Sequence, residues 1–577
     1  MNGAKALLVF SSFLFSIAVM HAEEEEEERF ARRVRAHLII NDSPSAVEEA
    51  LRSLLMYPHS SFLQASYISA LARFGDERKM IEAWESYVMQ FPDKELDREL
   101  IEVMAWGILQ KAAHSSSIIM RQMALLAALF SQDAKGVVIL RNAMHDSNYA
   151  VRAVAVKMSS HFRDQKLIDE VKRLFKEERV WIVRQEVIKA VGKMKIKELR
   201  SGLESFIASD ERHMIEKALA ITSLLELFDA IEPLNIVQLT KSKRAGLRQL
   251  VCQAIAHFNY TPGIDSLLAL SQDSNCDVRI AAWQALGQMN RAEVQDIVAV
   301  YEVQEFNYKV AISAAWVLML HSSEKGEEIM RKYINSPQRQ ERLLAASALA
   351  MTAPYGMPLI LEQFHTHEDP MVRLNLALGM IGQRQSTFLA TECIRDLLAA
   401  NQEPWSTTEV GIFRIISNQH IKNKEEQHAA PEVENQLIRL ELLNLLAMLK
   451  APGTQEAIRS YLRDSSTEIS ALAAASLLSE GDASAILLVQ QLLTDPQAKI
   501  RLQAALILSM WSREESAIQT LEEEYTKSGS ELKARIVEGI GRIGSVRSVP
   551  FLLTVIKEPS QTLRLIAAIA LIQCLNH

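Results

Sequence analysis

A short phrase recurs along this chain at nearly constant spacing, and it constrains the fold more than any other feature. It consists of a polar turn, an aliphatic residue followed by a basic one, and a run of small and apolar residues. Two examples are DSNYAVRAVAVKMSS from Asp146 and DSNCDVRIAAWQALGQM from Asp273. The basic position recurs at Arg121, Arg152, Arg184, Lys217, Arg248, Arg279, Lys309, Arg342 and Arg373, and after a gap it resumes at Arg439, Ser470, Arg501, Arg535 and Arg564.

A period of about 31 residues predicts a solenoid, because one unit of this size cannot bury its apolar face without its neighbours. Within each unit, an apolar segment with helical spacing is followed by a turn and a second helix. Asp273 and Asp495 are expected to cap second helices, and Pro370 and Pro496 suit a first helical turn. We therefore expect an all-α fold, an α-solenoid of antiparallel helix pairs over residues 116–577, in which the arginines bind the turns.

The phrase DxxxxVRxxAxxALG resembles HEAT repeats of the phycobilisome-lyase type. It is carried by Asp273, Val278, Arg279, Ala282, Ala285, Leu286 and Gly287. The resemblance covers roughly four-fifths of the chain, by the repeat register. It implies a curved stack whose second helices line the concave face, and a family that ranges from bilin lyases and hydroxylases to scaffolds without catalysis.

Two segments depart from the repeat. Residues 23–115 keep paired-helix periodicity with irregular spacing, and they resemble tetratricopeptide hairpins, so we interpret them as an amino-terminal cap. Residues 400–435 are polar and bounded by proline, which predicts a protruding loop or an irregular repeat. Insertions in solenoids often serve a binding face, and a tolerated surface loop is the alternative.

Residues 1–22 have the pattern of a secretory signal, with Lys5, an apolar stretch from Ala6 to Met20, and Ala22 before the expected cleavage site. We expect an exported protein, located in a bacterial periplasm. The alternative is an uncleaved amino-terminal segment that anchors the chain in the inner membrane. The apolar stretch is short for a span of about 20 residues.

The charge and the cysteines exclude several classes of partner and site. The formal net charge is -8, and residues 23–28 are all glutamate, so nucleic acid is not an expected partner. The four cysteines, Cys252, Cys276, Cys393 and Cys574, form no CxxC pair, which argues against a zinc or redox motif. We expect most of them to be buried thiols.

No constellation of catalytic residues is present in the sequence. His365, His367 and Glu368 lie in one short segment, which we interpret as a solvated turn rather than a metal site. The chain lacks HExxH, GxSxG and a phosphate-binding loop, so we expect no cofactor and a scaffold rather than an enzyme. The alternative function, implied by the family resemblance, is a bilin lyase or a chromophore-binding relative.

Two sets of residues are candidates for binding a protein or peptide partner. The first is a basic stripe in the early repeats, which could attract an acidic partner: Lys157, Lys189, Lys193 and Lys197. The second is an apolar stripe on the later second helices, which either receives a partner peptide or belongs to the core: Leu343, Leu374, Leu378, Leu440, Leu502, Leu506, Ile536, Ile540, Leu565 and Ile569.

The carboxyl-terminal segment TLRLIAAIALIQCLNH is apolar on nearly every side. From Leu563 to Leu575 only Arg564 and Gln573 are polar. Because the last helix of a solenoid has no successor to cover it, we expect this end to dock onto a second copy, a membrane or a partner. A homodimer is the first expectation, and coverage by the preceding repeat is the alternative.

Overall fold

The computed structural model describes residues 26–209, 213–231, 234–289, 305–400, 404–418, 431–462, 467–479 and 484–576. Helices make up almost all of this part of the chain, so the expected all-α solenoid is confirmed. The exception is one antiparallel pair of strands, β1 (Ser406–Val410) and β2 (Phe413–Ser417). The chain divides into two compact units. Residues 1–190 and 488–577 belong to unit 1, and residues 191–487 to unit 2.

Unit 1 contains both ends of the repeat array. Its amino-terminal helices are α2 (Ser43–Met56), α3 (Ser61–Phe74), α4 (Glu77–Gln90), α5 (Arg98–Ala113), α6 (Ile118–Ser131), α7 (Ala134–Ala143), α8 (Tyr149–Ser159) and α9 (Gln165–Glu177). Its carboxyl-terminal helices are α28 (Ala498–Trp511), α29 (Ile518–Tyr525), α30 (Ser530–Ile543), α31 (Val549–Val555) and α32 (Gln561–Asn576). Two helices continue across its boundaries, α10 (Trp181–Lys193) and α27 (Ser484–Gln491).

Unit 2 contains the central repeats and the strands. Its first helices run to the middle of the chain: α11 (Arg200–Ala208), α12 (Met214–Phe228), α13 (Ile236–Thr240), α14 (Ala245–His257), α15 (Ile264–Leu270) and α16 (Cys276–Met289). The next group precedes the strands: α18 (Tyr308–Leu320), α19 (Glu324–Ile334), α20 (Arg339–Ala350), α21 (Met357–Thr366), α22 (Pro370–Gly382) and α23 (Thr387–Ala400). After the strands come α24 (Pro431–Met448), α25 (Thr454–Tyr461) and α26 (Thr467–Ser479).

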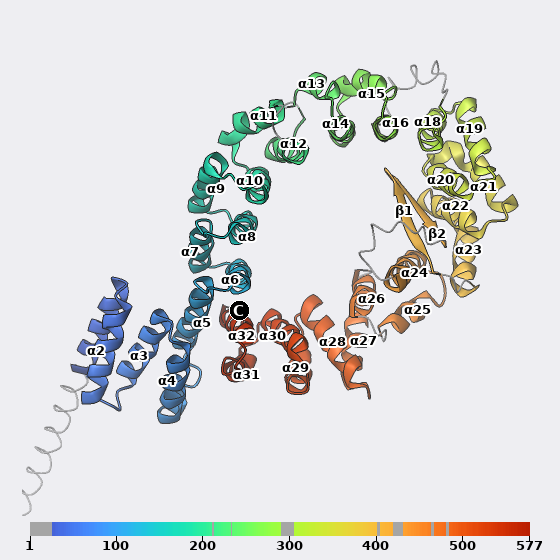
Figure 1. Cartoon of the computed structure of the whole chain (residues 1–577). Coiled ribbons are helices and arrows are strands. Elements are labelled where there is room, and N and C mark those ends of the chain that lie inside the picture. Colours follow the sequence, from blue (N-terminus) through green and yellow to red (C-terminus); the bar gives the residue numbers. More distant parts are fainter. Residues whose placement is uncertain are drawn as a thin grey trace, which may run out of the picture. The chain divides into compact units, whose positions relative to one another are not determined.

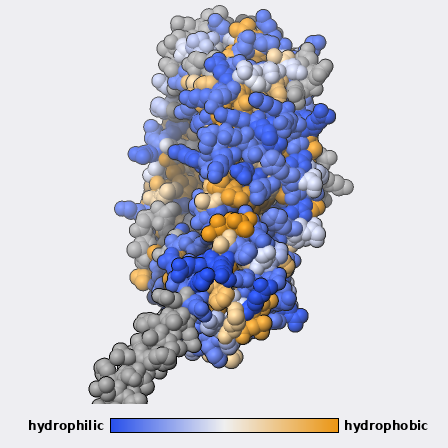
Figure 2. All heavy atoms as spheres, turned by 90° about the vertical axis from the view of Figure 1, so that its left-hand side faces the viewer, coloured by the Kyte–Doolittle hydropathy of each residue, from blue (hydrophilic) through white to orange (hydrophobic). Residues whose placement is uncertain are grey.

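The two helices of a repeat differ in how much of their surface is buried. The first helix is amphipathic: α9 buries only Leu167, Val171 and Leu174. The second helix is surrounded, and α18 buries every residue from Val310 to Leu320. This follows from the stacking, because a second helix contacts its own first helix and the second helices on both sides. The side of the molecule that carries α7 and α9 is accordingly mostly hydrophilic (Figure 2).

In several repeats the repeated arginine joins one repeat to the next. Arg279 donates from one guanidinium nitrogen to the carbonyl oxygens of Asp273 (2.8 Å) and Ser274 (3.3 Å) in its own turn. The same guanidinium pairs with Glu305 of the next turn at 2.8 Å. Corresponding pairs join Arg121 to Asp146, Arg152 to Glu178, Arg248 to Asp273 and Arg501 to Glu524. The expected binding of arginine to the turns is confirmed.

Asp273 and Asp495, the two aspartates expected to cap second helices, do not cap them directly. Asp495 accepts from the N–H of Gln497 at 3.0 Å, and Gln497 is itself the N-cap residue of α28. Asp369 caps α22, because its carboxylate accepts from the backbone N–H of Met371 at 3.0 Å, with Pro370 in the first turn. Asp273 instead accepts from the N–H of Asn275 at 2.9 Å. The side chain of Asn275 then accepts from Asp277 and Val278 at the start of α16. Asp273 therefore orders the turn and receives Arg248, while Asn275 caps the helix.

The last helix of the chain packs against the first repeat within unit 1. Helix α32 contacts α30, the preceding second helix, and also α5 and α6 (Figure 1). Arg564 donates to the carboxylate of Glu77 at 3.0 Å. Lys557 pairs with Glu85 at 2.6 Å. Every residue from Leu563 to Leu575 is buried or half-buried.

This packing corrects the expectation that the carboxyl-terminal helix requires a second copy, a membrane or a partner. The reasoning that an apolar last helix must be covered was right, but the cover comes from α5 and α6 of the same chain. The cover therefore requires both α5 and α6, near the amino terminus, and α32, near the carboxyl terminus.

In unit 2, the strands lie against the second helices. Strand β2 packs on α20 and α22, and β1 packs on α24 (Figure 1). Buried aromatic side chains fix this placement, since Trp405 and Phe413 are both 0% exposed. The segment expected as a loop or irregular repeat thus contains a β-hairpin, and the helical part resumes at Pro431, inside the range given for the insertion.

Two further expectations concern thiols and membranes. Cys252, Cys393 and Cys574 are buried and Cys276 is partly exposed, and all four are free thiols. Burial raises the pKa of Cys252 and of Cys574 to about 12, so both thiols stay protonated. No helix in the described ranges is long and apolar enough to cross a membrane. The expected signal or anchor at residues 1–22 lies outside these ranges.

Candidate interaction sites

The second helices of unit 2 bind the main chain of the hairpin through side chains. The carboxamide of Gln284 on α16 donates to the carbonyl of Val410 (2.9 Å) and accepts from the N–H of Ile412 (3.1 Å). The carboxamide of Asn375 on α22 donates to the carbonyl of Ile416 (2.9 Å) and accepts from its N–H (3.1 Å).

A third helix takes part in the same way. The hydroxyl of Ser347 on α20 donates to the carbonyl of Arg414 at 2.8 Å. We call Gln284, Ser347 and Asn375 the main-chain ladder. Arg414 and Ile416 alternate along β2, as backbone groups do on one edge of an extended strand, whereas Val410 and Ile412 flank the turn at Gly411. Ser347 and Asn375 therefore contact backbone groups that an extended peptide could present, and Gln284 contacts the tight turn.

Apolar contacts select the side chains of the hairpin. Phe413 meets the indole of Trp316 edge to face, with ring centroids 5.4 Å apart. Gly411 has φ of +60° in the tight turn, and a Cβ there would overlap the side chain of Gln284. This position therefore requires glycine for both its conformation and its close approach.

The sequence of residues 406–417 carries a pattern that favours this hairpin. Residues 406–417 read STTEVGIFRIIS, two runs rich in β-branched residues separated by a short turn with glycine. Such a pattern is typical of a hairpin. The polar residues around it favoured a loop instead.

The apolar stripe of the later second helices is largely buried. The members with at most 8% exposure are Leu343, Leu374, Leu440, Leu502, Leu506, Ile536, Ile540 and Leu565. Leu378 and Ile569 are half-buried. These residues lie in the core between helices, the alternative that the sequence left open, so the stripe does not form an open groove.

The basic stripe is only partly brought together. Lys189 and Lys193 lie one turn apart on α10, while Lys157 lies on α8 and Lys197 just before α11. Lys157, Lys193 and Lys197 are exposed, whereas Lys189 is half-buried and pairs with Glu186 at 2.8 Å. The stripe keeps exposed positive charge, and its role stays a prediction.

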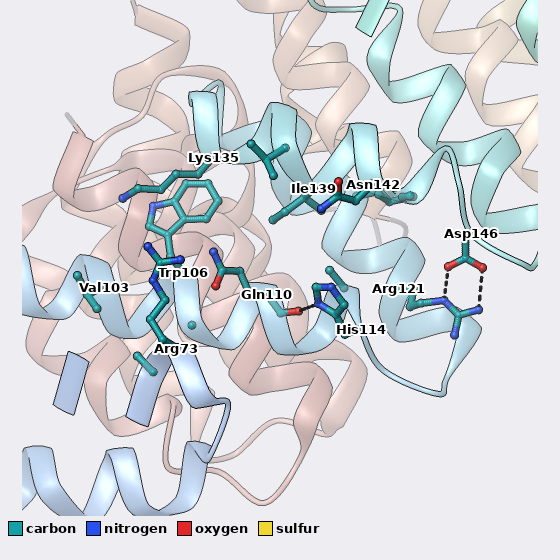
Figure 3. Close-up of a pocket in the computed structure, with 16 residues that line it drawn as sticks. Arg73, Val103, Trp106, Gln110, His114, Arg121, Lys135, Ile139, Asn142 and Asp146 are labelled. Atoms are coloured by element: carbon teal, nitrogen blue, oxygen red, sulfur yellow. Dashed lines mark hydrogen bonds and ion pairs between the residues drawn. The ribbon is translucent and has the colours of Figure 1, made fainter. Parts of the chain in front are cut away.

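A cavity of 400 Å³ lies in unit 1 between α3, α5, α6 and α7. Figure 3 shows its labelled side chains, with Trp106 and His114 from α5 and Lys135 from α7. The ammonium of Lys135 lies 5.3 Å from the centre of the Trp106 ring and 2.8 Å from the carboxylate of Glu102. Nδ1 of His114 bonds to the carbonyl of Gln110 at 2.7 Å.

The segment with His365, His367 and Glu368 forms a capped turn. His367 accepts from the N–H of Asp369 at 3.0 Å and lies 3.3 Å from the carbonyl of Ile334. Burial lowers the pKa of His367. Within the described ranges, no group of three His, Cys, Asp or Glu side chains could hold a metal ion.

Comparison with known proteins identifies the repeat. The family model for HEAT repeats matches residues 103–192, 137–223 and 485–572, at the start and the end of the array. No curated protein matches the chain.

Several solved structures are similar at low identity. Human deoxyhypusine hydroxylase has 15% identity and a TM-score of 0.22, covering 45% of this chain and 99% of its own. Kap121p has 10% identity and a TM-score of 0.33, with 93% and 80% covered. The myosin-binding chaperone UNC-45 has 11% identity and a TM-score of 0.29, with 90% and 72% covered. Likenesses this weak carry no argument about function.

Proposed function

We propose that this protein is an exported, non-catalytic scaffold that binds extended segments of a protein partner on its second helices. The observation that carries the proposal is the main-chain ladder, in which Ser347 and Asn375 hold strand β2 by its backbone and Gln284 holds the adjoining turn. HEAT repeats at both ends of the array support the same conclusion, because a stack of exposed helix pairs offers a long binding surface.

The physical basis is that a side-chain amide matches a peptide group. A carboxamide offers one donor and one acceptor to the carbonyl and N–H of an extended chain. Asn375 is 2% exposed, so its two bonds to Ile416 are shielded from water. A buried amide left without a partner costs about 1–3 kcal/mol. The ladder therefore favours an extended occupant over solvent.

Side-chain pockets beside the ladder define the kind of partner. The position of Phe413 against Trp316 favours an aromatic residue, and Ile415 and Ile416, at 7% and 4% exposure, favour β-branched residues beyond it. The hairpin is the occupant that the chain supplies itself. A partner segment of the same chemistry would bind by the same contacts.

The test replaces residues 404–418 by a Gly-Ser linker and supplies the peptide VGIFRIISN, residues 410–418, in trans. We expect saturable binding of the peptide by calorimetry, and about tenfold or more weaker binding after Asn375→Ala, since two buried backbone groups lose their partner. Asn335→Ala is the matched control, because Asn335 is exposed and bonds only within its own helix end.

The ladder hypothesis fails if a scrambled peptide binds equally well, or if Asn375→Ala has no more effect than Asn335→Ala. Circular dichroism of the linker variant establishes that the helices remain folded. A folded variant that binds no peptide would equally contradict the proposal.

The exposed lysines of the basic stripe are proposed to attract an acidic partner. Reversing the charge of Lys193 and Lys197 to Glu is expected to slow capture of an acidic protein at low salt, because screening removes such attraction above about 0.1 M. Unchanged capture at low salt would contradict this role.

Export rests on the pattern of residues 1–22. A reporter that is active only outside the cytoplasm, fused after residue 30 in a bacterial host, is expected to be active. A full-length product retained in the membrane would instead favour an uncleaved anchor, and a wholly cytoplasmic product would contradict export.

The phycobilisome-lyase resemblance supplies the enzymatic alternative. It is supported by the phrase around Arg279 and by HEAT repeats in general. Co-expression with a bilin distinguishes the two functions, since a lyase would yield a coloured adduct or transfer product and a scaffold would not.

A further inference from the structure

The cavity of unit 1 has features of a ligand site that do not depend on the proposed function. Helices α5 and α7 both contribute side chains to its walls (Figure 3). Its volume of 400 Å³ falls within the range of about 300–1,000 Å³ typical of small-molecule sites.

One buried donor in the wall has no protein acceptor. Trp106 is 3% exposed, and its indole Nε1 forms no hydrogen bond with any residue that the structure describes. Buried tryptophan N–H groups usually find a partner. The Trp106 N–H therefore has room for an acceptor that a ligand could supply.

The charges around this donor are positive on balance. Arg121 and Asp146, which line the cavity, neutralise each other at 2.8 Å. Lys135 is paired with Glu102. Arg73, at the end of α3, lines the same cavity and forms no ion pair with the described part of the chain. The guanidinium charge of Arg73 is therefore available to an anion.

The rest of the wall is mostly apolar, with Gln110, His114 and Asn142 as its other polar members. Its apolar residues include Val103 on α5 and Val138 and Ile139 on α7. A ligand that matches both the positive charge and the apolar side chains of the wall carries an anionic head and an apolar body. A guanidinium and an indole N–H together suit a carboxylate, which accepts through two oxygens.

We propose that this cavity binds a small carboxylate with an apolar body. The carboxylate accepts from the guanidinium of Arg73 and the indole N–H of Trp106. The apolar body lies against Val103, Val138 and Ile139, where it is removed from water. Lys135 adds positive charge above the indole ring without being the principal partner, since Glu102 holds its ammonium.

The experiment titrates 3-phenylpropanoate into the full-length chain by calorimetry, with 3-phenylpropanamide as the neutral isostere. We expect saturable binding of the acid that weakens with added salt, and at least tenfold weaker binding of the amide, because a charged hydrogen bond is lost. A third arm, acetyl-Gly-Gly-Phe with a free carboxylate, distinguishes the source of the ligand. Tighter binding of the peptide assigns the carboxylate to a chain terminus, and weaker binding assigns it to a small molecule.

Two variants test the assigned contacts. Arg73→Gln is expected to weaken binding of 3-phenylpropanoate about tenfold, and Trp106→Phe about two- to tenfold, because the latter removes only a neutral donor and keeps an aromatic ring. Arg78→Gln is the control. Arg78 lies on α4, its side chain is 90% exposed, and it pairs with Glu82 outside the cavity.

Three results would overturn the assignment: no saturable binding at millimolar concentration, equal binding of acid and amide, or an effect of Arg73→Gln no larger than that of Arg78→Gln. Arg73 is exposed, so its substitution leaves the fold intact and keeps the test decisive if Trp106→Phe proves unstable.

Discussion

At the scale of single residues, the repeated arginine shows what one sequence can and cannot predict. The position of Arg279, six residues after Asp273, predicted that its side chain would contact the turn of its own repeat. The acid of the next repeat was not predicted. Glu305 lies 26 residues further along, and that distance closes only when two repeats stack.

The acids in these bridges are held ionised. Burial alone would raise the pKa of Asp273, but hydrogen bonds from Arg248 and from the N–H of Asn275 outweigh it, and the pKa lies below its ordinary value of 3.8. A lowered pKa means that the ionised form stabilises the fold above pH 3.8 and that this contribution is lost as the pH falls through the lowered value.

We predict that Asp273→Asn lowers the free energy of unfolding by about 1.5–3 kcal/mol at neutral pH, the usual loss for a hydrogen bond to a charged group. The difference from the wild type should shrink below pH 3.8, where the wild type loses the same charge. Calorimetric melting temperatures across pH measure this. Glu82→Gln is the control, since its exposed pair contributes little. A difference independent of pH would exclude an ionic origin.

At the scale of secondary-structure elements, the helices were predicted and their surroundings were not. Period and turn residues gave the helix pairs, because those signals are local. Whether Leu374 faces a groove or the core depends on neighbours from other repeats and from the hairpin. The hairpin covers α20 and α22, and neither its own sequence nor theirs shows which helices it would cover. Periodicity alone leaves such an apolar stripe ambiguous.

Leu374→Ser is predicted to destabilise unit 2 by about 3–5 kcal/mol, since Leu374 is 0% exposed and the change adds a cavity and a buried hydroxyl. Thermal unfolding would measure the effect. Leu55→Ser serves as the control, because Leu55 on α2 is 86% exposed and should change little. Equal effects of the two substitutions would show that Leu374 is open to solvent.

At the scale of the molecule, segments from opposite ends of the sequence pack together within unit 1. The sequence of α32 indicated that the helix must be covered, but apolar side chains do not specify by what. Helices α5 and α6 provide the cover within unit 1, and Arg564 finds in Glu77 the kind of acid that other repeats find in their successors. Helix α32 is therefore packed both against α30 of its neighbouring repeat and against α5 and α6.

Arg564→Ala is predicted to loosen α32 from α5 and α6, because Glu77, at 6% exposure, keeps only the pairing with Lys111 at 3.4 Å. We expect a loss of about 1–3 kcal/mol. Amide hydrogen exchange in residues 561–576 should accelerate. Arg535→Ala, the same repeat position on α30 with a 54% exposed side chain, should leave that exchange unchanged. Exchange that does not respond to Arg564→Ala would mean that the contact carries no stability.

The junction of α32 with α5 and α6 also sets an order of events during synthesis. Glu77 and Arg564 are 487 residues apart, so a ribosome adding about 5–20 residues per second completes the second partner roughly 25–100 s after the first. Throughout that interval the surface of α5 and α6 that later receives α32 has been translated without its cover. Until α32 is made, that surface is open to solvent and to other proteins.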